Sequence, residues 1–287
     1  MELLQLTYFC EAAEWENFSR VAEKHNVPTS NISQTVKRLE AELSVELFSR
    51  TANRVRLSDK GRVFYEGVKA ALDSIEAAKR QLSDMGGEVS GELRLLIRTN
   101  RRIATVAIEK YKRLYPGVSI VIHHNVLGRY SDYDFIISDT RDSIPGFASW
   151  GLFREKIMLA TVKGSELESR GEITLPELSG ERFIAMSDNS RLSAITREIC
   201  KDAGFIPNVV ISTDDPYYVR KYVEIGMGVA LVPSISWKGQ LADNIVLMSI
   251  GKYERETALY FPKDKPFTKA ERLFADIITE TFREISE

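Results

Sequence analysis

Residues 18–61 read FSRVAEKHNVPTSNISQTVKRLEAELSVELFSRTANRVRLSDKG, and this stretch decides the fold at the start of the chain. It contains a short helical segment, a turn at Asn26-Val27-Pro28 and a longer helical segment over residues 29–43. An alternating basic segment follows. A helix, a tight turn, a second helix and a basic hairpin are the layout of a winged helix-turn-helix, which inserts one helix into a DNA groove.

Residues 3–15 form a further amphipathic helix before this stretch, because their apolar side chains recur at spacings of three and four. These side chains are Leu3, Leu6, Phe9, Cys10 and Ala13. Asn17 should break the run, and Ser19 is the expected N-cap of a short helix over Arg20–His25. In the turn, Asn26 tolerates left-handed backbone geometry and Pro28 suits a helix start.

The longer helix has one apolar face and one polar face. Ile32, Val36, Leu39 and Leu43 repeat at helical spacing and predict the buried side. The other side carries the predicted DNA-contacting residues of this helix: Thr29, Ser30, Asn31, Ser33, Gln34, Lys37 and Arg38. Gln and Asn can pair with adenine in the major groove, and Lys and Arg with guanine or phosphate. An ordinary solvated helix face is the alternative, and the neighbouring segments favour DNA.

The segment after this helix predicts a basic wing. Leu47 and Phe48 should anchor it on the core, while Arg50, Arg54 and Arg56 carry charge of one sign along an alternating stretch. Residues 29–60 hold six Lys/Arg against four Asp/Glu, whereas the first 28 residues hold two against five. Such an arm suits the sugar-phosphate backbone, where cationic side chains release counterions.

At this point the chain resembles the LysR-type transcriptional regulators. The motifs that carry the resemblance are L-x-x-F at 6–9, F-S-x-x-A at 18–22, S-x-x-V-x-x-L-E-x-x-L at 33–43, L-F-x-R at 47–50 and R-x-x-L-S-x-x-G at 54–61. Two positions depart from the family pattern. Pro28 stands where a polar residue is usual, and Ser30 stands where proline is usual, so the start of the helix differs.

Residues 59–85 predict one long helix, roughly 40 Å at 1.5 Å per residue. Its apolar stripe comprises Phe64, Val68, Ala71, Leu72, Ile75, Ala78, Leu82 and Met85. A long helix that is apolar on one side needs a partner for that side. The resemblance implies a second copy of the chain, and packing on its own chain is the alternative. Gly86-Gly87 and Ser90-Gly91 should end the helix and form a hinge.

The remainder predicts an α/β fold in which strands and helices alternate, with a mostly parallel sheet. Predicted strands are 92–99, 118–124, 133–138, 157–162, 182–187, 208–213, 228–234 and 257–263. Predicted helices are 104–115, 193–203, 218–225 and 268–285. We interpret this pattern as two small lobes that the chain crosses twice.

This half resembles the effector domain of the same family, which shares its fold with periplasmic solute-binding proteins. The matching stretches are YPGV at 115–118, DFIIS at 134–138 and VEIGMGVALVP at 223–233. The expected domains are a winged helix-turn-helix over 1–58, a linker and dimerisation helix with its hinge over 59–89, and a two-lobed effector-binding domain over 90–287. One departure stands out: residues 125–133 hold no helix where the family has one, so one wall of the first lobe should be reduced.

Ligands of such folds bind between the lobes, at strand carboxyl ends and helix N-termini. The candidate effector-binding residues are Thr99, Asn100, Arg101, His124, Ser138, Ser187 and Thr213. Free backbone N–H groups near Arg101 and Arg102 favour a small polar or anionic molecule. A cleft that binds no small molecule stays open as an alternative.

Composition excludes other classes of function. The 287 residues contain three histidines, none in a metal-binding spacing, and no G-x-S-x-G or phosphate-binding glycine loop, which argues against an enzyme, a metal or a cofactor. The distant Cys10 and Cys200 suggest free thiols, with redox sensing by Cys200 a minor alternative. An exported solute-binding protein would need a signal peptide and would leave residues 1–58 unexplained.

The expected partners follow from these patterns. They are double-stranded DNA, a small-molecule effector and further copies of the chain in a homodimer or homotetramer, with RNA polymerase as an additional candidate. No apolar run is long enough for a membrane span, and a cytoplasmic location is expected.

Overall fold

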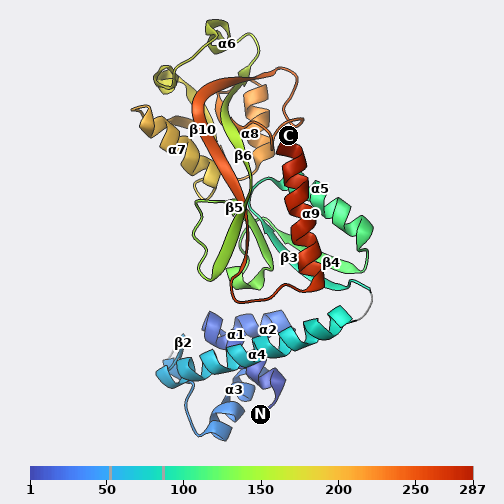
Figure 1. Cartoon of the computed structure of the whole chain (residues 1–287). Helices are drawn as coiled ribbons and strands as arrows, with labels where there is room; N and C mark the ends of the chain where they lie inside the picture. Colours follow the sequence, from blue (N-terminus) through green and yellow to red (C-terminus); the bar gives the residue numbers. More distant parts are fainter. Residues whose placement is uncertain (52–53, 86–87, 287) are drawn as a thin grey trace. The chain divides into compact units, whose positions relative to one another are not determined.

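Three helices, a β-hairpin and a long helix occupy the start of the chain in the computed structural model (Figure 1), which describes residues 1–51, 54–85 and 88–286. The elements are α1 (Leu3–Trp15), α2 (Phe18–His25), α3 (Thr29–Leu43), β1 (Phe48–Thr51), β2 (Arg54–Leu57) and α4 (Asp59–Met85). Residues 1–87 form one compact unit and residues 88–287 another. The predicted hinge glycines 86 and 87 lie outside the described residues.

Helix α2 begins two residues earlier than the sequence predicted. Asn17 adopts an extended backbone, and its side-chain oxygen accepts a hydrogen bond of 3.1 Å from the backbone N–H of Arg20. The predicted cap at Ser19 is therefore wrong, because Asn17 already satisfies a free N–H of the first turn. Asn26 ends α2 in the left-handed conformation, and Pro28 is the residue before α3, as the turn chemistry predicted.

The core of this unit contains most of the predicted apolar positions, but the prediction for Leu3 is wrong, because this first residue of α1 is exposed. Phe9, Val21, Ile32, Val36 and Leu39 are fully buried. Leu47 and Phe48 are buried in the same cluster, so the start of the hairpin is anchored as expected. The winged helix-turn-helix is confirmed.

The apolar stripe of α4 divides into two parts. Val68 is buried in the core of its own unit, and Phe64 and Leu72 pack against the same core. Ile75 and the alanines at 71 and 78 are exposed, while the side chains of Leu82 and Met85 lie outside the described part. The first part of the stripe therefore packs on its own chain, and self-association through the exposed part stays a prediction.

Two lobes make up residues 88–287. The first lobe contains β3 (Gly91–Ile97), α5 (Arg101–Leu114), β4 (Val118–His123), η1 (Tyr130–Asp132), β5 (Phe135–Asp139) and the C-terminal α9 (Lys269–Ser286). Helices α5 and α9 lie side by side over one face of the sheet (Figure 1). Their apolar sides bury Tyr111, Phe274 and Phe282 against Leu95 and Phe135.

The second lobe contains the remaining helices and a smaller sheet. Its elements are α6 (Glu166–Arg170), η2 (Leu175–Gly180), β7 (Arg182–Met186), α7 (Arg191–Asp202), β8 (Asn208–Thr213), α8 (Pro216–Glu224) and β9 (Ala230–Pro233). Strands β7 and β8 pair in parallel, and Phe183, Ile195 and Val219 lie in one buried cluster.

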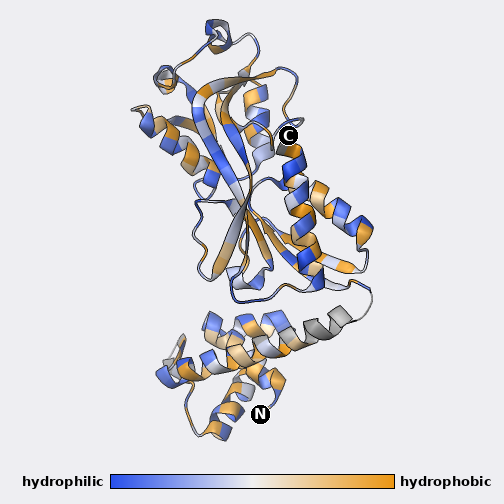
Figure 2. Ribbon diagram, viewed as in Figure 1, coloured by the Kyte–Doolittle hydropathy of each residue, from blue (hydrophilic) through white to orange (hydrophobic). Residues whose placement is uncertain are grey.

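Two long antiparallel strands, β6 (Phe147–Val162) and β10 (Ile245–Pro262), run through both lobes. They belong to a six-stranded sheet of order β4-β3-β5-β10-β6-β9. The predicted double crossing is confirmed, but the prediction of a mostly parallel sheet is wrong, because β10 pairs antiparallel with both β5 and β6. Only the apolar ends of β6 and β10 were predicted as strands. Figure 2 shows hydrophilic stretches in the middle of both strands, where the apolar alternation fails.

The short connection between β4 and β5 contains no α-helix, as predicted from residues 125–133. A small apolar cluster covers that face of the sheet instead. It comprises Leu96, Tyr133, Ile136, Ile144, Phe147, Ala258 and Tyr260. The phenol of Tyr133 accepts a hydrogen bond of 3.0 Å from the N–H of Leu127, which holds the connection in place.

The chain packs so closely against α4 at Gly61 that a larger residue there should be destabilising. A Cβ atom at Gly61 would lie 2.1 Å from the carbonyl oxygen of Leu47, whereas a Cβ at Gly67 of the same helix meets nothing within 4 Å. We expect Gly61→Ala to destabilise residues 1–87 by about 1–3 kcal/mol through overpacking. Gly67→Ala should stabilise the helix by about 0.5–1 kcal/mol. Urea unfolding measures both, and equal effects would contradict this packing.

Candidate functional site

The exposed face of α3 is the first candidate site. Thr29, Ser30, Asn31, Gln34, Lys37 and Arg38 are exposed and Ser33 is half-buried, so the structure brings all seven predicted side chains to one polar face. Their side chains form no hydrogen bond or ion pair with other residues in the described ranges, which leaves their donors and acceptors free. An α-helix with such a face fits the major groove.

The β1–β2 hairpin is held firmly against α3. The carboxylate of Glu40 on α3 accepts hydrogen bonds from the N–H groups of Leu47, at 2.9 Å, and Phe48, at 3.1 Å. Arg56 is exposed on β2, opposite Ser49. The side chains of Arg50 and Arg54 lie outside the described part of the structure, so their role in the wing stays a prediction.

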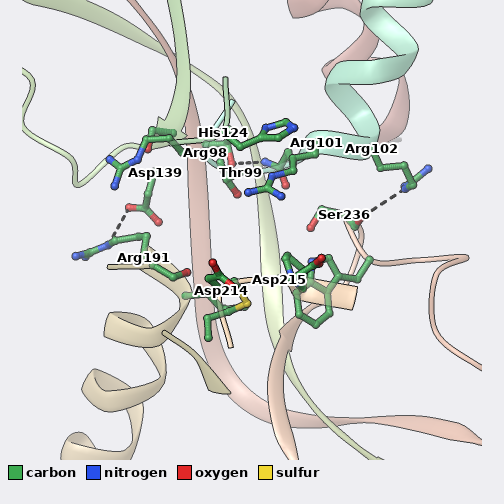
Figure 3. Close-up of a pocket in the computed structure, with 18 of the residues that line it drawn as sticks. Arg98, Thr99, Arg101, Arg102, His124, Asp139, Arg191, Asp214, Asp215 and Ser236 are labelled. Carbon is green, nitrogen blue, oxygen red and sulfur yellow. Dashed lines mark hydrogen bonds and ion pairs between the residues drawn. The ribbon is translucent and has the colours of Figure 1, made fainter. Parts of the chain in front are cut away.

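A cavity of about 470 Å³ lies between the two lobes of residues 88–287. Side chains from both lobes line it (Figure 3). Thr99, Arg101 and His124 come from the first lobe, and Asp214 and Asp215 come from the second. The cavity is therefore at the place predicted for an effector.

Three of the seven predicted effector-binding residues present free groups to this cavity. The hydroxyl of Thr99 is buried with no hydrogen-bond partner among the described residues. His124 Nδ1 lies 3.0 Å from the carbonyl oxygen of Ile97, so Nδ1 carries a proton and Nε2 remains for a ligand. Arg101 lines the cavity, and its side chain forms no hydrogen bond or ion pair with the described residues.

The other four predicted residues have structural partners. Asn100 and Ser138 line the cavity, but the Asn100 amide donates to Thr257 and the Ser138 hydroxyl to Asp142. Ser187 and Thr213 are not among the lining residues. The Ser187 hydroxyl bonds to the Asn189 side chain at 2.7 Å, and the Thr213 hydroxyl accepts a hydrogen bond of 3.3 Å from the N–H of Asp215. Both residues stabilise loops near the cavity rather than line it.

Arginines outnumber acidic residues in the lining of the cavity. Six arginines, at 98, 101, 102, 191, 220 and 255, face three aspartates, at 139, 214 and 215. Sequence reasoning missed most of these arginines. The one feature of the sequence that points to the other lining residues is their place beside predicted elements. Asp139 directly follows a predicted strand, and Arg191 precedes a predicted helix.

Arg101 and Arg220 are the two arginines of the lining that have a lowered pKa and form no carboxylate ion pair among the described residues. Burial lowers the pKa of each guanidinium, and Asp215 opposes this effect for both. Arg220 lies over the ring of Trp237, 5.0 Å from its centroid, and has no carboxylate ion pair among the described residues. In contrast, Arg98 pairs with Asp142 at 2.8 Å. A partly desolvated, unpaired guanidinium is a strong site for an anion.

Helix N-termini add to the positive potential. Helices α5, α7 and α8 begin at Arg101, Arg191 and Pro216, all of which line the cavity. The N-cap residues of α5 and α7 make no side-chain capping hydrogen bond, whereas Asp215 caps α8. The free N–H groups of α5 and α7 favour an anion near them.

Beneath the cavity, a buried polar network joins β6 and β10. Arg255 on β10 donates to Glu155 on β6 at 2.8 Å, to Asn100 at 2.9 Å and to Ser236 at 2.7 Å. The other oxygen of Glu155 accepts from the N–H groups of Ile235 and Ser236, at 2.9 and 2.8 Å. Every oxygen of this buried carboxylate therefore has a partner.

The described ranges contain no exposed thiol and no cluster of metal-binding side chains. Cys10 and Cys200 are both buried, and burial raises the pKa of the Cys200 thiol to about 11. The described residues hold no cluster of His, Cys, Asp and Glu side chains that could bind a metal ion. No helix among them is both long enough and apolar enough to cross a membrane.

A winged helix-turn-helix together with a two-lobed α/β fold defines the class of this protein, a DNA-binding transcriptional regulator with an effector-binding domain. Residues 3–62 match the bacterial regulatory helix-turn-helix protein model of the lysR family, and residues 86–283 match the LysR substrate binding domain. The chain belongs to the LysR family of transcriptional regulators.

Similar proteins agree with this family over the full length. The transcriptional dual regulator GltC of Bacillus subtilis is 27% identical over 304 residues, covering 100% of this chain and 99% of GltC. A hydrogen peroxide-inducible genes activator of Dickeya chrysanthemi is 25% identical over 292 residues, covering 98% and 95%. Full-length CbnR in complex with its target DNA has the same fold, with a TM-score of 0.60, 18% identity and coverage of 98% and 100%.

The burial of Cys200 makes its reactivity testable. With its pKa raised to about 11, the thiolate fraction at pH 8 is far below that of a free cysteine with a pKa near 8.5. We expect iodoacetamide to leave Cys200 unmodified in the native protein at pH 8 and to alkylate it rapidly in urea. Peptide mass spectrometry measures both rates, and fast native alkylation would show that the thiol is accessible.

Proposed function

We propose that this LysR-type regulator binds a small anionic molecule in the cavity between its lobes and that the bound anion controls DNA recognition by α3 and the hairpin. The observation that carries the proposal is Arg101, which lines the cavity with a partly desolvated charge and no ion-pair partner in the described structure. The buried, unpartnered hydroxyl of Thr99 adds a hydrogen-bond donor to the same site.

Charge and size support an anion over a cation. Asp214 and Asp215 are exposed, so water screens their charge, whereas Arg101 and Arg220 are half-buried. A cavity of about 470 Å³ falls within the usual range of small-molecule sites. A ligand that contacts Arg101 on one lobe and Arg220 on the other would favour one angle between the lobes, because binding shifts an equilibrium only through different affinities for its states.

The peroxide signal named for one relative does not suit this chain. Thiol oxidation requires an accessible thiolate. Cys200 is buried with a raised pKa, and Cys10 is buried in the helix-turn-helix core. We therefore infer that an anion, rather than oxidation of a cysteine, supplies the signal.

On the DNA side, we propose that α3 reads base edges while the hairpin contacts the phosphate backbone. The exposed polar face of α3 supports this assignment, as does the fixed position of the hairpin beside it. A homodimer or homotetramer would present two copies of α3 to a two-fold symmetric site. Ile75 and its exposed neighbours on α4 are the proposed contact between copies, and RNA polymerase is a proposed partner on the DNA.

Gln34 and Arg56 should affect DNA binding in different ways. Gln34→Ala should reduce the difference in binding free energy between specific and random DNA by about 1–3 kcal/mol, because a base contact distinguishes sequences. Arg56→Ala should weaken both affinities alike and reduce the salt slope by about 1, because phosphate contacts do not depend on sequence. Fluorescence anisotropy on an operator selected from random duplexes measures both. The same effect from the two variants would contradict the division of roles.

Arg101 should decide the response to the effector. In a thermal-shift screen of anionic metabolites, we expect a hit at 100 times its Kd to raise the Tm by roughly 5–10 °C. Arg101→Ala should weaken that hit about 10- to 100-fold by removing a charged hydrogen bond, without changing ligand-free DNA binding. Arg113→Ala is the matched control, because Arg113 is exposed near the end of the same helix. A hit that binds Arg101→Ala as tightly as wild type would refute the site, and a screen without hits would favour control by another protein.

A further inference from the structure

Four charged side chains connect the two lobes at the rim of the cavity. In the first lobe, Asp139 is the last residue of β5 and Arg141 follows this strand; in the second lobe, Arg191 and Glu198 lie on α7. We call these four residues the interlobe clamp.

Two contacts of the clamp cross from lobe to lobe. Arg141 Nη1 donates to Glu198 Oε2 at 3.0 Å. Arg191 Nε lies 3.7 Å from Asp139 Oδ1, an ion pair drawn in Figure 3. Within each lobe the clamp is closed by further contacts, with Arg141 Nε at 2.9 Å from Asp139 and Arg191 Nη2 at 3.5 Å from Glu198.

The first-lobe half of the clamp is rigidly held. The phenol of Tyr260 donates to the carbonyl oxygens of both Asp139, at 2.7 Å, and Asp142, at 2.8 Å. The Asp139 carboxylate is buried and accepts from both the backbone and the side chain of Arg141. The side-chain hydrogen bond to Asp139 is the main reason that the pKa of Arg141 is raised. Arg141 is therefore preorganised to receive Glu198.

The second-lobe half is incomplete. Arg191 Nε is buried and has no hydrogen-bond partner among the described residues, because Asp139 is beyond hydrogen-bond distance. Arg191 also lines the cavity as the first residue of α7. Because this Nε is buried against Asp139, an anion in the cavity would reach it only by displacing the Asp139 carboxylate, and it would then take the place of Asp139 as the partner of the guanidinium.

We propose that the interlobe clamp holds the lobes together in the ligand-free protein and that Arg191 is the group through which an anion releases it. The holding part needs no ligand, and the releasing part rests on the proposed function. Exposed ion pairs are individually weak. The clamp would therefore favour one arrangement of the lobes without fixing it, so that a ligand can shift the populations.

Distances between the lobes in the full chain test the holding part. Spin labels at Lys263→Cys in the first lobe and Ser169→Cys in the second report the separation by pulsed electron paramagnetic resonance. Both positions are exposed, whereas both native thiols are buried. Labelled protein is diluted with unlabelled protein so that only distances within one chain are measured.

Glu198→Gln removes a crossing charge without touching the cavity lining, and Glu166→Gln is its control. Glu166 forms an exposed Arg–Glu pair with Arg170 inside α6, so its loss breaks a similar contact within one lobe. We expect Glu198→Gln to raise the population of the longer separation several-fold and Glu166→Gln to leave the wild-type distribution unchanged. Identical distributions for Glu198→Gln and wild type would overturn the clamp.

Inorganic phosphate tests the releasing part, compared with sodium chloride at equal ionic strength. Phosphate should shift the wild-type distribution in the direction of Glu198→Gln and should shift that variant less. If Glu198→Gln opens the lobes but phosphate leaves wild type unchanged, the link between Arg191 and the anion falls while the clamp stands. Because the first test contains no ligand, its failure is separate from a failure of effector binding.

Discussion

The buried ion pair between Glu155 and Arg255 is the interaction on which the effector-binding half depends. These residues lie directly opposite each other in the pairing of β6 and β10, at the point where both strands pass from one lobe to the other. Burying two charges costs several kcal/mol for each ion, and their mutual attraction offsets this cost only when further hydrogen bonds satisfy both groups. Here each partner has further hydrogen bonds, from Ile235 and Ser236 to the carboxylate and from the guanidinium to Asn100.

This pair also determines the shape of the cavity above it. Asn100 has a left-handed backbone, with φ of 54°, and its amide is held between Arg255 and Thr257. A left-handed asparagine costs little, because its short side chain can form local hydrogen bonds. The turn at Asn100 directs Thr99 and Arg101 into the cavity. The free groups proposed to bind an anion are therefore positioned by a network that binds no ligand itself.

Both compact units combine local contacts with contacts between residues far apart in sequence. In residues 1–87, the cap at Asn17 and the bonds from Glu40 to the start of the hairpin join residues less than ten positions apart, whereas Glu16 accepts from the N–H of Leu57, 41 positions away. In residues 88–287, Arg255 and Glu155 are 100 positions apart, and Arg141 and Glu198 are 57 apart.

The sequence alone determined the winged helix-turn-helix, the polar face of α3 and the missing helix between β4 and β5, because local periodicity and turn chemistry specify these features. The place of the cavity followed from the order of strands and helices, since ligands of such folds bind at strand carboxyl ends. Only the tertiary structure decided the full length of β6 and β10. The polar residues at the centre of both strands do not show the apolar alternation of a strand, and the hydrogen-bonded pair of Arg255 and Glu155 becomes apparent only in the folded chain. It also separated Thr99 and Arg101, which present free groups to the cavity, from Ser187 and Thr213, whose hydroxyls bond to nearby loop residues. The physical reason is that a charged or hydroxyl side chain takes its role from its partner, and most of these partners are brought together only by folding.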